Sequence, residues 1–504
     1  MKNIFLATIF AAGAIFTSCD MDMKPYGSLD DETAIQTVND CYRFRNGLYS
    51  SMRGLTTGSF VYFSDIQMDQ FQGTTANGNR LGIISQGEIY SSDGDITGYW
   101  SSLYSIINSA NYIIEKIENL KASAELSTSD LAALTRYDGE AHFVRAYCYY
   151  WLADHFCETY SAENAQAAAK GLPLVTVYHP TGDLTSYPGR STQDETYKLI
   201  DDDLTVAYNA LVEFEKTDKS NVAANASYLS SYAVLALQAR IALLKGDNET
   251  ALSKAETIIN SGIYPLTELA DYKKLWADDE GTEVIFRPFM SATELGNSTG
   301  GTYLSTNEDN ADYIPTYDVL NMYGEGDVRF DTYFTVWELT DSKVQAYVFT
   351  KYPGNIDLRT TPSTPNYMNM SKPFRTSELY LIAAEAAATT NPTLANKYLN
   401  DLRSKRIEGY ENGSYSGQNL INAIREERQK ELIGEGFRMS DLRRWGLGFQ
   451  RNPSHPENPQ IESILVTTSS SVAYEAGDHR YVWPIPADEI QTNPQMQGQQ
   501  NPGY

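Results

Sequence analysis

Two pairs of helical segments, each divided by a turn, limit what this 504-residue chain can fold into. In residues 226–262, apolar and small residues recur at helical spacing in two runs, and Gly246-Asp247 ends the first run and caps the second. Residues 376–404 repeat the arrangement, with Thr376-Ser377 as the expected cap of one helix and Asn391-Pro392 as the start of the next. Small residues on facing sides allow two helices to approach closely. The sequence therefore predicts a mainly α-helical, tetratricopeptide-repeat-like scaffold of helical pairs.

Helical spacing of apolar residues also occurs outside these two pairs. It predicts helices over 99–120, 129–156 and 192–211, and one more that ends at Gly434. The three aspartates at 201–203 are expected on the solvated face of the third of these helices. The scaffold should therefore extend on both sides of the central pair.

Residues 265–375 have a different character, because Gly, Thr, Asn, Asp and Tyr dominate and helical spacing is faint. Short alternating runs at 333–337 and 344–350 predict small strands. A long irregular insertion on a helical scaffold is usually functional, and its aromatic content argues against disorder. We therefore expect a large, loop-rich insertion that contains short β segments.

The first residues indicate export. Lys2 is followed by an apolar run over 4–16 and then by Thr17-Ser18-Cys19, the pattern of a lipoprotein signal in which Cys19 becomes the acylated first residue. Ordinary signal cleavage beside an incidental cysteine is the alternative. The apolar run is too short to span a bilayer as a stable helix, and no later stretch is apolar enough. We therefore expect a soluble body that is tethered by its lipid.

These patterns predict three parts: a signal peptide over 1–18, an acylated, flexible tether over 19–40 and a single domain over 41–504. Within the domain we expect the helical scaffold at about 41–264 and 376–445, the loop-rich ligand region at about 265–375 and an extended C-terminal segment at 446–504.

The formal net charge of −26 restricts the partners of this chain. So acidic a body repels nucleic acids and anionic membrane surfaces, and it suits neutral ligands or cations. With 65 acidic residues some carboxylate pair will always resemble a glycosidase acid and base, but no GxSxG, HExxH or Walker motif occurs. A hydrolase remains the alternative class. With five histidines and no CxxC motif, we expect no metal and no cofactor.

The last quarter of the chain carries a succession of short motifs. They are Arg425-Glu426-Glu427-Arg428, Glu435-Gly436-Phe437-Arg438, Asp441-Leu442-Arg443-Arg444-Trp445, Trp483-Pro484-Ile485-Pro486 and a final Asn501-Pro502-Gly503-Tyr504. This succession resembles the SusD/RagB family, whose members are surface lipoproteins that capture nutrients for a TonB-dependent outer-membrane transporter. None of the motifs is catalytic. From the residues themselves we expect Glu427, Arg428, Arg443 and Arg444 to form structural ion pairs, and Trp445 and Trp483 to be core residues.

The resemblance implies a non-enzymatic, SusD-like protein that is lipid-anchored in the outer membrane and faces the cell exterior. It implies capture of an oligosaccharide or polysaccharide and delivery to a SusC-like TonB-dependent transporter. Peptide binding, as in the RagB branch, is the alternative within the family. A pure interaction protein that only caps its transporter is another.

The resemblance also implies that loops near the first helices and the insertion build the ligand site. Sugar binding needs an aromatic face under a pyranose ring and planar polar groups for its hydroxyls. The candidates are Arg80 and Trp100 in the first region and Tyr303, Tyr313 and Trp337 in the insertion, with Tyr317 and Tyr323 as further possibilities. A surface ion pair for Arg80 and a core position for Trp100 are the structural alternatives.

Overall fold

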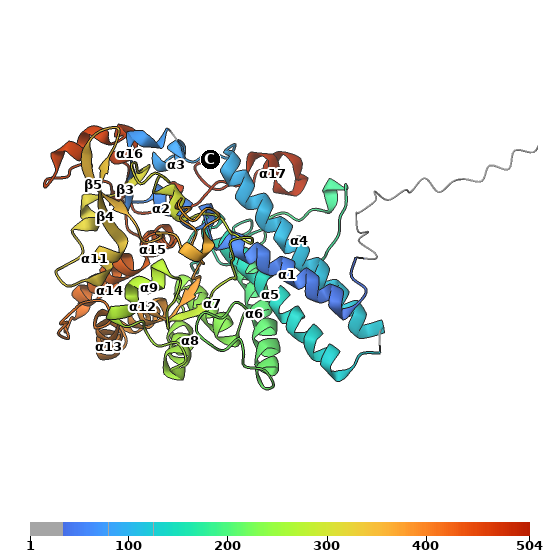
Figure 1. Ribbon diagram of the computed structural model, residues 1–504. Helices are drawn as coiled ribbons and strands as arrows, with labels where there is room; N and C mark the ends of the chain where they lie inside the picture. Colours follow the sequence, from blue (N-terminus) through green and yellow to red (C-terminus); the bar gives the residue numbers. More distant parts are fainter. Residues whose placement is uncertain (1–33, 79, 124) are drawn as a thin grey trace, which may run out of the picture.

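The computed structural model describes residues 34–78, 80–123 and 125–504 (Figure 1). The expected signal peptide at 1–18 and the expected lipidation site Cys19 lie outside the described residues. Across the described residues, no helix has the length and apolarity that crossing a membrane requires. The first helix begins at Val38, inside the last residues of the segment expected as a tether.

Six helices form the N-terminal part of the scaffold, and the long helix α5 lies among them, in contact with α1, α4 and α6. They are α1 (Val38–Leu55), α2 (Ser59–Gln67), α3 (Gly82–Ser85), α4 (Gly94–Ser123), α5 (Thr128–Phe156) and α6 (Gln193–Glu215). The predicted helices over 99–120, 129–156 and 192–211 are confirmed. Helix α6 begins at a capping box, in which Thr192 and Glu195 each bond the backbone N–H of the other.

The two predicted helical pairs are present and stack on each other. The first is α7 (Ser231–Leu244) with α8 (Asn248–Ser261), where Asp247 caps α8 by accepting from the Thr250 N–H at 3.1 Å. The second is α12 (Thr376–Ala387) with α13 (Pro392–Arg403), where Asn391 caps α13 and Pro392 occupies its first turn. Helix α8 packs on α12, and α14 (Gly417–Leu432) packs on α12 and α13. The scaffold is therefore continuous from one pair to the next.

Two local expectations are wrong. Arg375, and not Thr376-Ser377, occupies the N-cap position of α12, and its side chain does not cap the helix. The Thr376 hydroxyl donates to the Glu283 carbonyl oxygen at 3.4 Å, and the Ser377 hydroxyl accepts from the Arg375 guanidinium. Asp203 is not on a solvated face: it is buried and forms a two-bond pair with Arg145, at 2.6 and 2.8 Å. In both places the side chain bonds an arginine: Ser377 bonds Arg375, and Asp203 bonds Arg145. The sequence pattern had instead predicted a helix cap and a solvated carboxylate.

The loop-rich region lies beside the scaffold and contains only short elements (Figure 1). They are α9 (Tyr272–Ala277), β2 (Val284–Phe286), β3 (Tyr313–Pro315), α10 (Tyr317–Leu320), α11 (Val328–Tyr333), β4 (Phe334–Leu339), β5 (Val344–Phe349) and β6 (Phe374–Arg375). The predicted strands at 333–337 and 344–350 are confirmed as the antiparallel hairpin β4–β5, in which Trp337 pairs with Ala346.

The remaining strands form small two-stranded sheets that join distant parts of the chain. Strand β1 (Phe71–Gly73) pairs with β3, β2 pairs with β6, and β7 (Phe449–Gln450) pairs with β8 (Ala473–Tyr474). The C-terminal part also holds α15 (Arg438–Arg444), α16 (Thr467–Ser470) and α17 (Ala487–Thr492). The loop-rich region is thus fastened both to the N-terminal helices, through β1, and to the start of α12, through β6.

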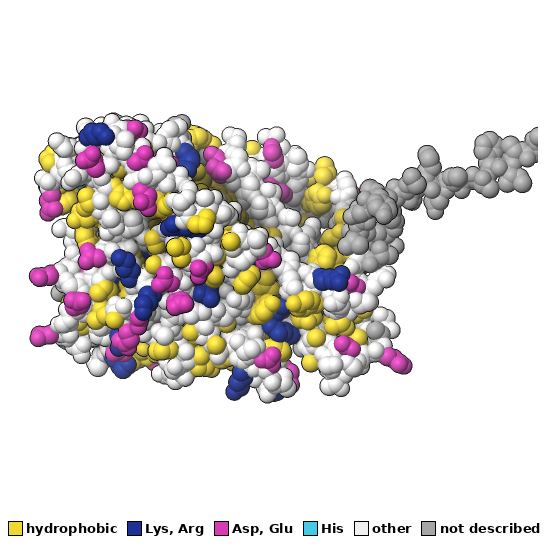
Figure 2. Space-filling model, viewed as in Figure 1, with side chains coloured by type: hydrophobic (Ala, Val, Ile, Leu, Met, Phe, Trp, Pro, Cys, Tyr) yellow, Lys and Arg dark blue, Asp and Glu magenta, His cyan; other side chains and the backbone are white. Residues whose placement is uncertain are grey.

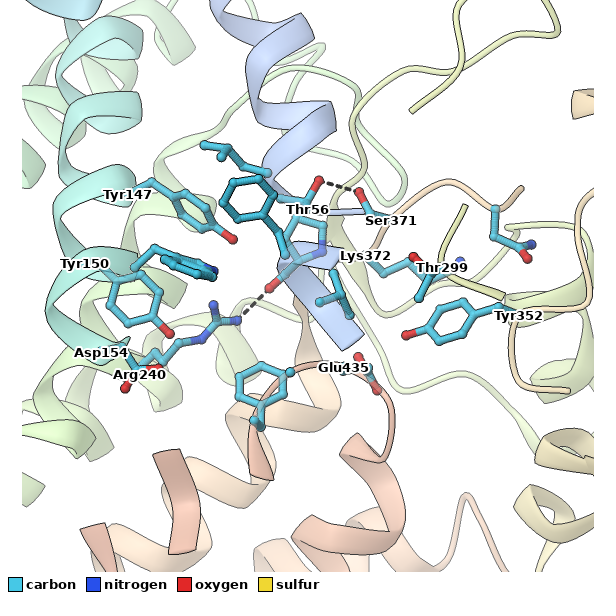
Figure 3. Close-up of a pocket in the computed structure, with 18 of the residues that line it drawn as sticks. Thr56, Tyr147, Tyr150, Asp154, Arg240, Thr299, Tyr352, Ser371, Lys372 and Glu435 are labelled. Atoms are coloured by element: carbon cyan, nitrogen blue, oxygen red, sulfur yellow. Dashed lines mark hydrogen bonds between the residues drawn. The ribbon is translucent and has the colours of Figure 1, made fainter. Parts of the chain in front are cut away.

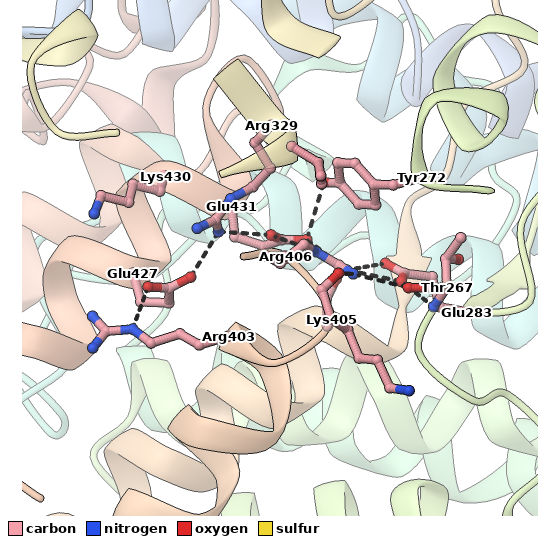
Figure 4. Close-up of polar contacts among 12 residues, drawn as sticks. Thr267, Tyr272, Glu283, Arg329, Arg403, Lys405, Arg406, Glu427, Lys430 and Glu431 are labelled. Carbon is pink, nitrogen blue, oxygen red and sulfur yellow. Dashed lines mark hydrogen bonds and ion pairs between the residues drawn. The ribbon is translucent and has the colours of Figure 1, made fainter. Parts of the chain in front are cut away.

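A buried network of ion pairs fixes the loop-rich region to the scaffold (Figure 4). Glu431 of α14 pairs with Arg329 of α11 and with Arg406, which follows α13, each at 3.0 Å. Glu427, one helical turn earlier, pairs with Arg329 and Arg403 at 2.7 Å. Burial opposes ionisation of Glu431, but the neighbouring arginines, Arg406 foremost, hold the pKa of its carboxyl well below the usual value. The fully buried carboxylates therefore stay charged and paired.

The predicted structural roles of the C-terminal motif residues are confirmed for Glu427, Arg428, Arg443 and Arg444. Beyond the Glu427 pairs, the contacts are Arg428–Asp441 at 2.8 Å, Arg443–Asp154 at 3.0 Å and Arg444–Glu385 at 2.8 Å. Trp483 is fully buried among aromatic rings and donates from its indole N–H to Gln67 at 3.0 Å, so its predicted core position is also confirmed. The predicted core position of Trp445 is wrong, because this residue is only partly buried and the guanidinium groups of Arg425 and Arg444 lie 5.0 and 4.9 Å from its ring centre.

Candidate functional site

The structure buries three of the five residues predicted from sequence to contact a ligand. Trp100 is 5% exposed and packs on Tyr104 and Phe156. Tyr303 is fully buried, with its ring centre 4.8 Å from those of Phe71 and Phe349. Both residues therefore offer no free ring face to a ligand.

Tyr313 lies on β3 and is also fully buried. Its hydroxyl donates to the backbone carbonyl of Arg80, so it holds the loop that carries Arg80 in place. Trp100, Tyr303 and Tyr313 are core residues in this structure, and a sugar cannot stack on them. Sequence could not separate them from surface aromatics, because each is covered by residues far away in the chain.

Arg80 is at the surface, where 49% of its side chain is exposed. It forms an ion pair with Asp312 and donates from Nη2 to the carbonyl oxygen of Thr302 at 3.0 Å. The structural alternative of a surface ion pair is thus realised. The exposed half of the side chain remains accessible at the rim of the loop-rich region.

Trp337 is partly exposed and lines a cavity of about 260 Å³. Because strand residues alternate between the two faces of the hairpin, Thr335 lies on the same face as Trp337. Ala346 stands opposite Trp337 on β5, and so small a side chain leaves the indole uncrowded by its cross-strand neighbour. Within the described part of the chain, no residue accepts a hydrogen bond from the indole N–H.

Polar side chains line the same cavity as the indole. Two threonines (Thr335 and Thr350) supply hydroxyls, and Glu308 and Asp331 supply exposed carboxylates. An aromatic face with carboxylates and hydroxyls beside it is the combination that binds the apolar face and the hydroxyl groups of a sugar ring. We refer to Trp337 and these four polar residues as the Trp337 site.

One segment, residues 302–312, connects Arg80 with the Trp337 site. Arg80 bonds Thr302 and Asp312 at its two ends, and Glu308 from its middle lines the cavity. The segment is fixed to the hairpin because the Thr340 N–H donates to the Asp309 carbonyl oxygen at 2.8 Å. Two of the predicted residues, Arg80 and Trp337, therefore flank the same surface segment.

A small cavity lies between helices α2, α5 and α7 and the loop-rich region (Figure 3). Its volume of about 80 Å³ has room for no more than a few water molecules, each of which occupies roughly 30 Å³. Its charged groups are already paired: Arg240 with Glu378 at 2.7 Å, and Lys372 with Asp279 at 2.8 Å. This cavity is too small and too fully paired to take a sugar.

The described residues hold no group of three or more His, Cys, Asp or Glu side chains that could bind a metal ion. The cysteines Cys41, Cys148 and Cys157 are free and buried. Burial raises the pKa of the Cys148 thiol above its usual value, so this thiol is not a ready nucleophile.

Comparison with known protein families gave matches at both ends of the chain. Residues 336–504 match the SusD family, and residues 21–243 match a family described as starch-binding and associating with the outer membrane. Among curated proteins, SusD-like protein P38 of Formosa agariphila is 23% identical over 497 residues, which cover 88% of this chain and 91% of that protein.

Solved structures resemble this chain over nearly its whole length. A SusD superfamily protein from Bacteroides thetaiotaomicron is 27% identical, with a TM-score of 0.75 and coverage of 93% of this chain and 100% of the other. A SusD-like carbohydrate binding protein from Bacteroides vulgatus is 19% identical and has the same fold, with a TM-score of 0.73 and coverage of 92% of this chain and 98% of the other.

Proposed function

Because this chain belongs to the SusD/RagB family of non-catalytic binding proteins, we propose that it captures a glycan at the cell surface. In this proposal the acyl chain on Cys19 holds the protein on the outer membrane, and a SusC-like TonB-dependent transporter receives the captured glycan. One family match carries association with the outer membrane in its description, and several relatives of the same fold are named for carbohydrate binding.

The observation that supports glycan capture most directly is the Trp337 site. A partly exposed indole shares a cavity, open to solvent, with two hydroxyls and two carboxylates. The aromatic face suits the C–H groups of a pyranose ring, and the carboxylates suit pairs of neighbouring hydroxyls. Arg80 lies at the edge of the same segment and can donate to further hydroxyls.

The charge of the protein favours uncharged glycans. The net charge is −26, and Figure 2 shows Asp and Glu side chains distributed over the visible face, between exposed hydrophobic groups. A sulfated or uronate-rich polysaccharide would be repelled by this surface, particularly at low salt. We therefore propose a neutral polysaccharide or oligosaccharide as the ligand.

Native electrophoresis of the full chain through gels that contain single polysaccharides tests this function. Soluble starch, laminarin, xylan and galactan make a suitable panel, and a peptide array serves as the counter-test. We expect at least one polysaccharide to retard the protein, with no shortened products after incubation. Retention by peptides with no retardation in any polysaccharide gel would point to the RagB-type alternative, and new product chains would point to a hydrolase.

A further inference from the structure

The β4–β5 hairpin has a second cavity on the face opposite Trp337. Neighbouring residues of a strand point to opposite faces, so Val336 points away from the Trp337 site. Tyr347 is the cross-strand partner of Val336. Gln345 lies two residues before Tyr347 on β5 and therefore points to the same face. All three line a cavity of about 400 Å³, whose other walls are α10 with the residues that follow it and residues 455–461.

Aromatic rings stand on two sides of this cavity. Tyr347 lies on the hairpin side and Tyr317 of α10 on the other, and both are partly exposed. Each ring is held by a second ring: Tyr347 by Phe330, at 5.3 Å between centres, and Tyr317 by His455, at 6.2 Å. Val336 lines the same cavity and is 48% exposed. The cavity therefore offers preformed apolar faces to a ligand.

Planar polar groups complete the lining. The side chains of Asn321, Gln345 and Glu457 are exposed, and each can bond sugar hydroxyls through an amide or carboxylate. One Glu457 oxygen also accepts from the Tyr317 hydroxyl at 3.4 Å, which links two of these lining residues. Asn458 donates from Nδ2 to the Gln345 carbonyl oxygen at 2.7 Å, which fixes the C-terminal wall to the hairpin. The described residues that line the cavity include no Lys or Arg, so no permanently charged cation is there to pair with an anion.

The chemistry of this cavity selects one kind of ligand. Its volume falls within the range of about 300–1,000 Å³ in which small-ligand pockets are found. The two tyrosines suit a ring with C–H groups, amides and a carboxylate suit neighbouring hydroxyls, and the absence of Lys and Arg from the described lining disfavours phosphate or sulfate. These properties together describe an uncharged sugar ring.

We propose that the cavity between Tyr317 and Tyr347 is a second sugar-binding site, which takes an uncharged pyranose unit. The inference rests on the proposed glycan-binding function and extends it, because the hairpin then presents one sugar site on each of its faces. Two sites on one rigid element bind a polymer more tightly than either site alone, since the second contact is intramolecular. Short oligosaccharides gain no such advantage.

The test uses full-length protein and whichever polysaccharide of the starch, laminarin, xylan and galactan panel retards it. Single variants Tyr347→Ala and Tyr317→Ala probe the second cavity from its two walls, so a folding defect in one leaves the other informative. Trp337→Ala probes the first site. Tyr187→Ala is the matched control, because Tyr187 is an exposed tyrosine of the 181–187 loop and lines neither cavity.

Calorimetry with short oligosaccharides of the same glycan counts the sites, and gel retardation measures binding of the polymer. We expect two oligosaccharides per wild-type chain and one for each tyrosine variant, with polymer binding weakened about tenfold or more. The double variant Trp337→Ala/Tyr347→Ala should lose binding, and Tyr187→Ala should match the wild type.

The outcomes separate this inference from the function on which it rests. A single wild-type site that is lost in Trp337→Ala and unchanged in both Tyr317→Ala and Tyr347→Ala overturns the second site and leaves glycan capture standing. A single site that depends on both tyrosines and not on Trp337 supports the cavity as a sugar site and moves the function to it. Absence of retardation by every polysaccharide overturns both proposals.

Discussion

The loop-rich region holds both exposed and buried aromatic residues. Substituting an exposed one should change ligand affinity, and substituting a buried one should change the free energy of unfolding. Trp337 lies at the surface of a hairpin, whereas Tyr303 is enclosed by Phe71 and Phe349. We expect Trp337→Ala to weaken glycan binding by about one to two decades, roughly 1–3 kcal/mol, because an aromatic anchor carries a large share of binding energy. The free energy of unfolding should change little, as denaturant titration of the same variant will show. Unchanged affinity would remove Trp337 from the site.

Tyr303 should behave in the opposite way, because its substitution acts on stability. Its hydroxyl is buried and has no hydrogen-bond partner among the described residues. Removing an unpaired buried polar group relieves its desolvation cost, so Tyr303→Phe should raise the free energy of unfolding by about 1 kcal/mol. Tyr303→Ala, which also leaves a cavity, should lower it by roughly 3–5 kcal/mol. Urea titration of the two variants checks both signs, and a destabilised Tyr303→Phe would contradict the account.

His155 gives the protein a pH-dependent stability. Burial lowers the pKa of this imidazole from 6.5 to about 4, against the opposing charge of Asp154. Between these two values the unfolded chain binds a proton that the folded protein does not, so this contribution to stability is lost as pH falls from about 6.5 towards 4. The loss amounts to about 3 kcal/mol at most, from 1.36 kcal/mol per pKa unit.

His155→Phe should flatten this dependence. A phenyl ring can keep the stacking on Trp151, where the ring centres are 3.7 Å apart, and it does not titrate. Guanidinium unfolding at pH 7, 5.5 and 4.5 should show a smaller decrease for the variant than for the wild type. Parallel decreases would mean that other groups, and not His155, cause the acid sensitivity.

At the scale of elements, the turn between α7 and α8 shows how a local signal contributes to a repeat-like pair. Gly246 adopts a positive φ of 74°, which favours glycine, and Asp247 caps α8. Asp247→Ala should lower the free energy of unfolding by about 1 kcal/mol, the usual effect of removing an N-cap. Asp202→Ala is the control, since Asp202 is an exposed residue of α6 with one ion pair to Lys198. Its effect should stay under about 0.5 kcal/mol. Equal effects in thermal or chemical unfolding would argue against a capping contribution.

At the scale of the whole molecule, the proposed function depends on an anchor and a partner. In its native host, Cys19→Ala should prevent acylation, and the protein should leave the outer-membrane fraction, because the described body has no membrane-spanning helix to retain it. Mild-detergent purification of the wild type should recover a TonB-dependent transporter together with the protein. Unchanged fractionation of the variant would refute the anchor. Repeated absence of a barrel, under conditions that keep other outer-membrane complexes intact, would count against the partner.

Features that are encoded within a few neighbouring residues could be predicted from the sequence. Helical spacing, the Gly246-Asp247 turn and the Asn391-Pro392 start placed both helical pairs, and alternation placed the strands of the hairpin. These signals suffice because a cap, a turn or a periodic stripe depends on its own segment. The order of the C-terminal motifs likewise indicated the family without any knowledge of contacts.

Which aromatic residues are available to a ligand depends on how distant segments pack in the folded protein. Tyr303 is buried by Phe71 and Phe349, which lie far from it in sequence, and Asp203 is paired with Arg145 across 58 residues. Trp337 stays accessible because its hairpin faces a cavity, which no property of the sequence 333–337 reveals. Tyr317 and Tyr323 were candidates from the sequence and both line the second cavity, but the cavity itself escaped prediction, since its walls come from α10, the β4–β5 hairpin and residues 455–461. Burial is a property of contacts between distant segments, so it can be read only after the chain has folded.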